Sequence, residues 1–111
     1  MEVNVRTIDQ VTVVDLIGEI DASTAAAAEA QILLLAASAS KLLLEMTGVT
    51  FMSSAGLRLL LSTYRHISDR GGRVVLVGLS EDLRDTMSMT GFLEFFPTHD
   101  TLEGALELLN C

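Results

Sequence analysis

The chain begins with a pattern of alternating hydrophobic and polar residues. Hydrophobic residues recur at close to every second position in residues 3–8 and 11–20, a period that predicts β-strands. Between these segments, Asp9 and Gln10 form a turn signal. Two strands joined by so short a turn predict an antiparallel hairpin.

The pattern then becomes that of a helix followed by a buried strand. Residues 23–37 are rich in alanine and have high helix propensity, and Ala28, Ile32, Leu35 and Ala36 give them an apolar face. Three candidate capping residues precede this helix: Asp21, Ser23 and Thr24. Residues 41–46 form a short apolar run that is typical of a central strand covered on both faces, and Thr47-Gly48 after it is a turn signal.

Residues 57–69 show the clearest helical period in the chain. The apolar positions follow the i, i+3, i+4, i+7 series of an amphipathic helix: Leu57, Leu60, Leu61, Tyr64 and Ile67. The polar positions take the other face: Arg58, Ser62, Arg65 and Asp69. We expect this helix to begin near Ser53-Ser54 and to end at residues 70–72, where glycine can adopt a left-handed conformation.

The last third of the chain predicts two more strands and two more helices. Residues 73–78 are β-branched and bounded by glycine, as in a buried strand, and Ser80 is the expected cap of a third helix. That helix carries Leu83, Met87 and Met89 and closes at Thr90-Gly91. Residues 95–98 predict a short strand with Pro97 at a sheet edge or a strand end, and Asp100 with Glu103 resembles a capping box. The last helix is expected to bury Leu102, Ala105, Leu106 and Leu109.

The resulting order, β-β-α-β-α-β-α-β-α, predicts an α/β fold with a mixed, mainly parallel sheet, an N-terminal hairpin and about four helices. With 111 residues, of which half are hydrophobic, residues 1–111 are expected to form one domain. In such sheets functional sites collect at the carboxyl ends of the parallel strands. We therefore expect this edge to bring together Asp21, the pair Ser53-Ser54 and residues 78–80.

The charge of the chain excludes several classes of partner. A formal charge of −8 repels phosphate backbones and anionic lipids, so no nucleic-acid partner and no membrane insertion are expected. The lone cysteine, Cys111, fits a reducing compartment, and no secretory signal is visible, so a cytoplasmic protein is expected. His66 and His99 have no partners at metal-ligand spacing, and no cofactor motif is present.

The helix start at Ser53-Ser54 is the candidate site. The first N–H groups of a helix lack intrahelical partners, and the helix dipole places partial positive charge there, so the position favours anions. A hydroxyl at this point can cap the helix or carry a phosphate. Ser53 is the expected cap.

Four segments resemble the STAS domain in its small form, the anti-sigma-factor antagonists of bacteria. The segments are residues 16–21 (Leu-Ile-Gly-Glu-Ile-Asp), residues 49–57 (Val-Thr-Phe-Met-Ser-Ser-Ala-Gly-Leu), Gly78, and residues 89–92 (Met-Thr-Gly-Phe). Members of that family usually read Asp-Ser-Ser-Gly or Asp-Ser-Thr-Gly at the helix start, and a partner anti-sigma factor that is itself a kinase phosphorylates the serine after the aspartate. The resemblance makes Ser54 the phosphate acceptor. Here Ser53 stands in place of the aspartate, and Ala55 follows the acceptor.

The resemblance implies partner switching, in which the unphosphorylated domain binds an anti-sigma factor and the phosphorylated domain lets it go. The implied binding residues are Asp21, Ser53, Ser54, Ala55, Gly56 and Arg58. Since Ser53 replaces the aspartate, a STAS scaffold or accessory subunit that is never phosphorylated is the alternative. A serine enzyme is disfavoured, because Met52 stands where the first glycine of a Gly-x-Ser-x-Gly elbow belongs.

Overall fold

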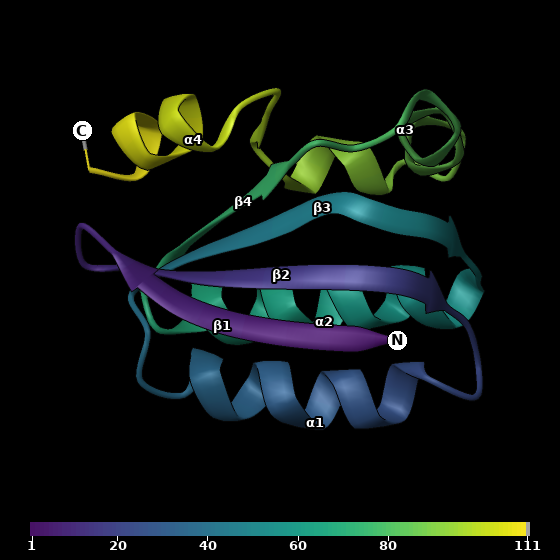
Figure 1. Ribbon diagram of the computed structural model, residues 1–111, viewed down its shortest axis with the longest axis horizontal. Helices are drawn as coiled ribbons and strands as arrows, with labels where there is room; N and C mark the ends of the chain where they lie inside the picture. The colour runs from purple at the N-terminus through teal and green to yellow at the C-terminus, as the bar shows by residue number, and fades with distance from the viewer. Residues whose placement is uncertain (111) are drawn as a thin grey trace.

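The computed structural model describes residues 1–110, so Cys111 lies outside the described part of the chain. This part forms five strands, four α-helices and one 3-10 helix (Figure 1). In chain order they are β1 (Glu2–Ile8), β2 (Val11–Ile20), α1 (Ala25–Ala36), β3 (Lys41–Met52), α2 (Ser54–Asp69), β4 (Arg73–Val77), α3 (Glu81–Met89), η1 (Phe92–Phe95), β5 (Thr98–His99) and α4 (Leu102–Leu109).

The five strands form one sheet in the order β1-β2-β3-β4-β5. β1 pairs antiparallel with β2, and every other pair is parallel. The hairpin turn places Asp9 and Gln10 at φ angles of 51° and 70°, the left-handed region used by tight hairpin turns. The predicted fold class, a mainly parallel mixed sheet with an N-terminal hairpin and four helices, is confirmed.

The sheet is covered on both faces, with α1 and α2 on one side and α4 on the other (Figure 1). Consecutive strand residues alternate between the two sides: Leu42 and Leu44 pack with α1 and α2, while Leu43 between them packs with α4. All three leucines are fully buried. The prediction that residues 41–46 form a strand covered on both faces is therefore confirmed.

β3 does not stop at the predicted turn. It continues through Thr47 and Gly48 to Met52, because the long β2 offers it partners as far as Ile20. At Gly48 a Cβ atom would lie 3.1 to 3.3 Å from atoms of Leu16 and Ile17. Gly48 therefore allows the two strands to approach closely and does not turn the chain.

The segment predicted as a strand over residues 95–98 is also different. Phe95 ends η1, Phe96 is buried, and the strand itself is only Thr98–His99. The rings of Phe95 and Phe96 each lie 5.5 Å from the Tyr64 ring of α2, whereas the Pro97 carbonyl oxygen accepts a hydrogen bond from Leu76 N of β4 over 3.0 Å. The expected edge position next to Pro97 is confirmed, since β5 is the last strand of the sheet.

Three smaller predictions about the helices were wrong. The cap of α4 is Thr101, whose hydroxyl accepts a hydrogen bond from Gly104 N over 3.1 Å, and not Asp100. On α2, Leu59 is buried while Leu61 is only partly buried. Met89, the last residue of α3, is 88% exposed, whereas Met87 is fully buried as expected.

Candidate functional site

The candidate site lies where β2 and β3 end side by side. Ile20 and Met52, the last residues of the two strands, are register partners. The backbone N–H of Ser53 donates to the carbonyl oxygen of Ile20 over 2.9 Å. This bond joins the two strand ends, so Asp21 and the pair Ser53-Ser54 lie at the same edge of the sheet, as the sequence predicts.

Ser53 is the N-cap of α2. Its backbone is extended, with φ −85° and ψ −178°, and its hydroxyl accepts a hydrogen bond from Ala55 N over 3.2 Å. A serine hydroxyl is well suited to this position because it satisfies one of the unpaired N–H groups at the helix start. The expected role of Ser53 as a cap is thus seen directly in the geometry.

Ser54 is the first residue of α2, and its side chain is exposed. Within residues 1–110 no side-chain hydrogen bond holds its hydroxyl, in contrast to that of Ser53. Arg58 follows one helical turn later and is also exposed. Ala55 is partly buried against the core. The surface at this helix start therefore consists of Ser54 and Arg58, with part of Ala55.

Gly56 is buried and belongs to the packing beneath this surface. A Cβ atom at this position would overlap Met52 Cγ and would lie 3.0 Å from Ile20 Cγ2. No side chain larger than hydrogen fits without a shift of its neighbours. Gly56 thereby lets the first turn of α2 rest directly on the ends of β2 and β3.

Asp21 organises the turn between β2 and α1. Its Oδ1 atom accepts hydrogen bonds from the Ser23 hydroxyl at 2.6 Å, from Ser23 N at 2.9 Å and from Thr24 N at 3.2 Å. The bond from the Ser23 hydroxyl, helped by the backbone bonds, lowers the pKa of the Asp21 carboxyl below its ordinary value. Asp21 is therefore a carboxylate at neutral pH, and it places a fixed negative charge in the turn between β2 and α1.

The sequence alone did not identify Ser23 as a hydrogen-bond partner of Asp21. An aspartate followed two residues later by serine is the usual pattern of a turn in which the aspartate side chain accepts from the backbone. Thr24, the N-cap by position, has no side-chain bond to the helix; its hydroxyl donates to Glu19 O over 3.0 Å. The three candidate caps thus have separate roles.

Residues 78–80 do not join this site. Glu45 pairs with Val77, the last residue of β4, while β3 continues to Met52. The difference is seven residues, or roughly 23 Å at about 3.3 Å per residue. Gly78 instead lies against the Thr47 hydroxyl, and Ser80 caps α3 by accepting from Leu83 N over 3.2 Å. The prediction that one edge gathers all three loops is wrong because the strands are unequal in length.

Nucleophilic catalysis has little support in this geometry. Ser54 and His66 lie on the same helix twelve residues apart, a separation of about 18 Å along its axis. A histidine base has to be within hydrogen-bond reach of the serine that it activates. In residues 1–110, no cluster of three or more histidine, cysteine, aspartate or glutamate side chains could hold a metal ion.

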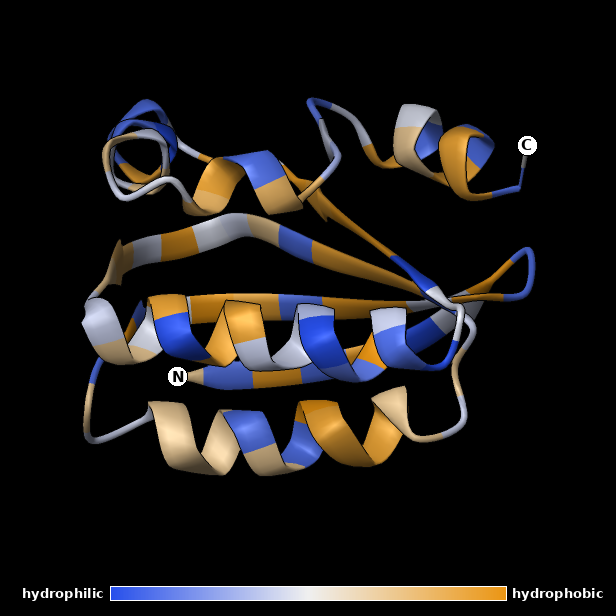
Figure 2. Cartoon of the chain, turned by 180° about the vertical axis from the view of Figure 1, so that it is seen from behind, coloured by the Kyte–Doolittle hydropathy of each residue, from blue (hydrophilic) through white to orange (hydrophobic). Residues whose placement is uncertain are grey.

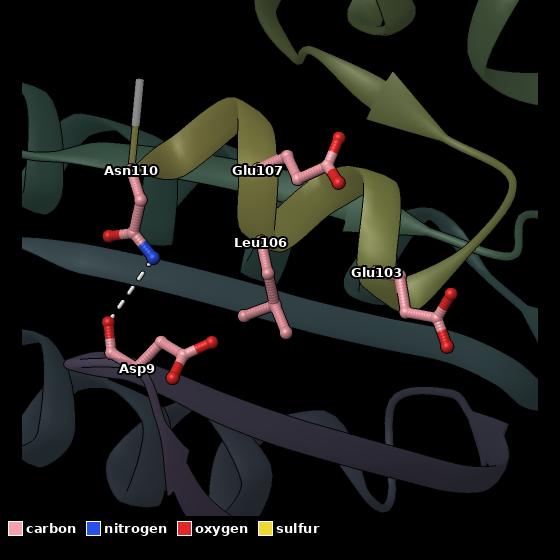
Figure 3. A pocket seen from close by; sticks show the side chains of 5 residues that line it. All are labelled: Asp9, Glu103, Leu106, Glu107 and Asn110. Carbon is pink, nitrogen blue, oxygen red and sulfur yellow. Dashed lines mark hydrogen bonds between the residues drawn. The ribbon is translucent and has the colours of Figure 1, made fainter.

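Two hollows of the surface lie away from this helix start, and one of them, of about 440 Å³, is lined by Arg84, Thr98, His99 and Asp100. A depression of about 390 Å³ lies between the hairpin turn and α4, where Asn110 Nδ2 donates to Asp9 O over 3.2 Å (Figure 3). Its lining includes three carboxylates: Asp9, Glu103 and Glu107. It is at the end of the sheet away from Ser53, because the turn at Asp9 starts β2 and the site follows the end of β2.

No helix in the described residues is long and apolar enough to cross a membrane.

Comparison with known proteins gives a consistent result. The family model of the STAS domain matches residues 2–105. BtrV, a candidate anti-sigma factor antagonist of Bordetella bronchiseptica strain RB50, is 29% identical over 109 residues, which cover 95% of this chain and 91% of BtrV.

Solved structures agree with this match. The crystal structure of an anti-sigma factor antagonist from Mycobacterium paratuberculosis is 32% identical with a TM-score of 0.90, covering 99% of this chain and 94% of that one. The structure of the Bacillus cell fate determinant SpoIIAA in its phosphorylated form has a TM-score of 0.75 at 21% identity, covering 96% and 97% of the two chains. At that identity the second likeness shows the fold alone.

Proposed function

This chain belongs to the STAS domain family, and from this premise we propose that it is an anti-sigma-factor antagonist that acts by partner switching. When Ser54 is unphosphorylated, the chain binds an anti-sigma factor that is also a serine kinase. When Ser54 is phosphorylated, the complex separates. The chain acts in the cytoplasm as one domain, residues 1–111, without a cofactor or catalytic residues of its own.

The observation that carries this proposal is the exposed hydroxyl of Ser54 at the first position of α2, which no side-chain hydrogen bond holds within residues 1–110. Phosphoryl transfer from ATP forms a bond between Ser54 Oγ and phosphorus, breaks the bond to ADP and releases the hydroxyl proton. The product carries about −1.5 to −2 charges, which the N-terminus of α2 tolerates. The fold therefore needs no rearrangement, while a surface bound to a partner gains bulk and charge.

Each proposed binding residue has a distinct part in this surface. Asp21, Ser54 and Arg58 supply charge and hydrogen-bonding groups, and Ala55 supplies a small apolar contact. Ser53 and Gly56 act indirectly: Ser53 caps the helix, and Gly56 lets it rest on the strand ends.

One observation favours a second candidate, a STAS scaffold or accessory subunit that is never phosphorylated. Ser53 stands at the position where the resemblance to the family implies an aspartate, so the acceptor has no carboxylate immediately before it. Asp21 is the residue after Ile20, whose carbonyl oxygen accepts a hydrogen bond from Ser53 N. For the phosphorylated alternative, we propose that the kinase recognises the Asp21 carboxylate in place of the aspartate that Ser53 replaces.

The test is to incubate the chain with purified anti-sigma kinases of its host and ATP and to locate phosphate by mass spectrometry. Phosphate on Ser54 and separation of the complex are expected, with Ser54→Ala as the control that accepts no phosphate. A chain that binds the anti-sigma factor but is phosphorylated on neither Ser53 nor Ser54 would favour the scaffold. Ser54→Asp should keep the melting temperature near that of the wild type while weakening binding.

A further inference from the structure

The positive charges of this acidic chain are concentrated on and just after α2. Four of the seven basic residues but one of the fifteen acidic ones lie between residues 46 and 80, so this stretch carries a formal charge of +3 in a chain of −8. The four are Arg58, Arg65, Arg70 and Arg73. Figure 2 shows α2 crossing the front of the molecule with strongly hydrophilic segments, whereas α1 below it is mostly apolar.

Two of these arginines lie in one line with Ser54. Ser54, Arg58, Leu61 and Arg65 are spaced i, i+4, i+7 and i+11, which places them within about 60° of one another around the helix. We call these four residues the α2 stripe. Arg58, Leu61 and Arg65, together with Ser62 and His66, line a shallow depression of about 360 Å³.

The arginines of the α2 stripe are available for a partner. Arg58 and Arg65 are exposed, and within residues 1–110 neither forms an ion pair or a side-chain hydrogen bond. Other basic residues are engaged: Arg6 Nε lies 3.2 Å from Asp15 Oδ2, and Lys41 Nζ donates to Asn110 Oδ1 over 2.7 Å. The stripe thus combines two free positive charges with an apolar side chain.

We propose that the α2 stripe binds an acidic segment of the anti-sigma factor, whose carboxylates pair with Arg58 and Arg65 and whose apolar side chain lies on Leu61. We also propose that a phosphate on Ser54 releases this segment by pairing with Arg58. Charge complementarity supports both statements, because this is the positive surface of an otherwise acidic molecule. The inference rests on the proposed function and adds the chemistry of the partner.

The spacing of Ser54 and Arg58 allows this competition within the helix. Residues four apart have Cβ atoms about 5–6 Å from each other, within reach of an arginine and a phosphate. A phosphate binds guanidinium more strongly than a carboxylate does when it is held in place, since it presents up to three acceptor oxygens and about twice the charge. Phosphorylation would therefore cancel the positive end of the stripe and repel an acidic partner.

The first experiment measures the dissociation constant of the anti-sigma factor for the wild type, Arg58→Glu, Arg65→Glu and the double variant. Both arginines are exposed, so the variants should fold, which circular dichroism checks. Each reversal should weaken binding at least about tenfold, because it places like charges together. Lys41→Glu, which makes the same charge change on another element, should stay within about twofold of the wild type.

Salt provides a second readout of the same complex. Raising the salt from about 0.1 M to about 1 M shortens the Debye length from about 10 Å to about 3 Å, so the wild type should bind more weakly while the double variant changes little. A double variant that binds like the wild type would overturn the inference and leave the proposed function standing. A wild type that binds no anti-sigma factor would overturn both.

The second experiment tests the role of Arg58 in release. Ser54→Asp is introduced into the wild type and into Arg58→Gln, and the loss of binding is compared in the two backgrounds. If the negative charge acts by pairing with Arg58, the loss should be at least about threefold smaller when Arg58 is absent. Equal losses in both backgrounds would refute release through Arg58.

A second copy of this chain is the competing occupant, because Asp9, Glu103 and Glu107 line an acidic depression at the other end of the sheet. Such a contact would join unlike surfaces and lead to closed rings or open chains of molecules. Sedimentation of the chain alone should show no association at low salt. Association that the double variant Arg58→Glu, Arg65→Glu abolishes would assign the α2 stripe to self-assembly and overturn the inference.

Discussion

The backbone N–H of Ser53 donates to the carbonyl oxygen of Ile20 over 2.9 Å, which ties the start of α2 to the end of β2. This bond crosses between two elements that are more than thirty residues apart in the chain. It fixes the position of Ser54 relative to Asp21 without using either side chain. The proposed acceptor is therefore held by the backbone of the fold, and its own hydroxyl stays exposed.

Substitutions of Ser53 and Ser54 should differ in their effect on the free energy of unfolding. Ser53→Ala removes the cap of α2 and should lower the free energy of unfolding by about 1 kcal/mol, because Ala55 N loses its acceptor. Ser54→Ala should change it by less than about 0.5 kcal/mol, since the side chain is exposed. Urea unfolding followed by circular dichroism measures both. Equal effects of the two substitutions would contradict the assignment of the cap.

Gly56→Ala distinguishes packing from helix propensity by the sign of its effect. An alanine in an open position of a helix would stabilise it by about 1 kcal/mol relative to glycine. Here the added methyl group would overlap Met52, so a loss of about 1–3 kcal/mol is expected in thermal or urea unfolding. Ser62→Ala, at a more open position of α2, is the control and should change stability little. A stabilised Gly56→Ala would show that α2 does not rest on the strand ends.

The carboxyl of Asp21 should titrate below its ordinary pKa of 3.8. Its pKa is lower in the folded chain, so its contribution to stability is complete above the ordinary pKa and is lost as the pH falls through the folded pKa. Carbon-13 NMR of the carboxyl group measures this directly. Ser23→Ala should raise the pKa of Asp21, because the Ser23 hydroxyl is the main cause of its lowering. Ser88→Ala, on another helix, should leave it unchanged.

Two neighbouring residues of α1 test which face of this helix is buried. Ile32 is completely buried, and Ile32→Ala should cost about 2–5 kcal/mol through lost contacts and a cavity. Leu34 is 77% exposed, so Leu34→Ala should stay within about 0.5 kcal/mol of the wild type. Thermal unfolding of the two variants gives the comparison. A larger effect at Leu34 would mean that α1 is rotated about its axis.

α1 also shows where sequence reasoning reaches its limit. Nine of its twelve residues are alanine or leucine, so helix propensity alone predicts a helix, and the structure confirms it over Ala25–Ala36. The apolar face predicted from the sequence is confirmed at Ala28, Ile32 and Ala36, which are buried, and Leu34 lies outside it. Leu35, predicted on the same face, is only partly buried, and packing against the rest of the fold decides that difference.

The lengths of the strands also could not be predicted from the local sequence pattern. Thr47-Gly48 has the composition of a turn, but β2 extends far enough to pair with the chain beyond it, and Gly48 is needed for close approach to Ile17. This extension of β3 carries Ser53 away from the end of β4. It also leaves residues 78–80 outside the candidate site.

The sequence by itself determined the order of the elements, the hairpin, the start of α2 and the cap at Ser53, because these depend on periodicity, propensity and hydrogen bonds within a few residues. Tertiary structure decided the stagger of the strands, the burial of Gly56 and the hydrogen bond from Ser53 N to Ile20 O. It also decided that, within residues 1–110, Arg58 and Arg65 form no ion pair. These features depend on which segments meet in space, and a one-dimensional pattern does not contain the distances that select those contacts.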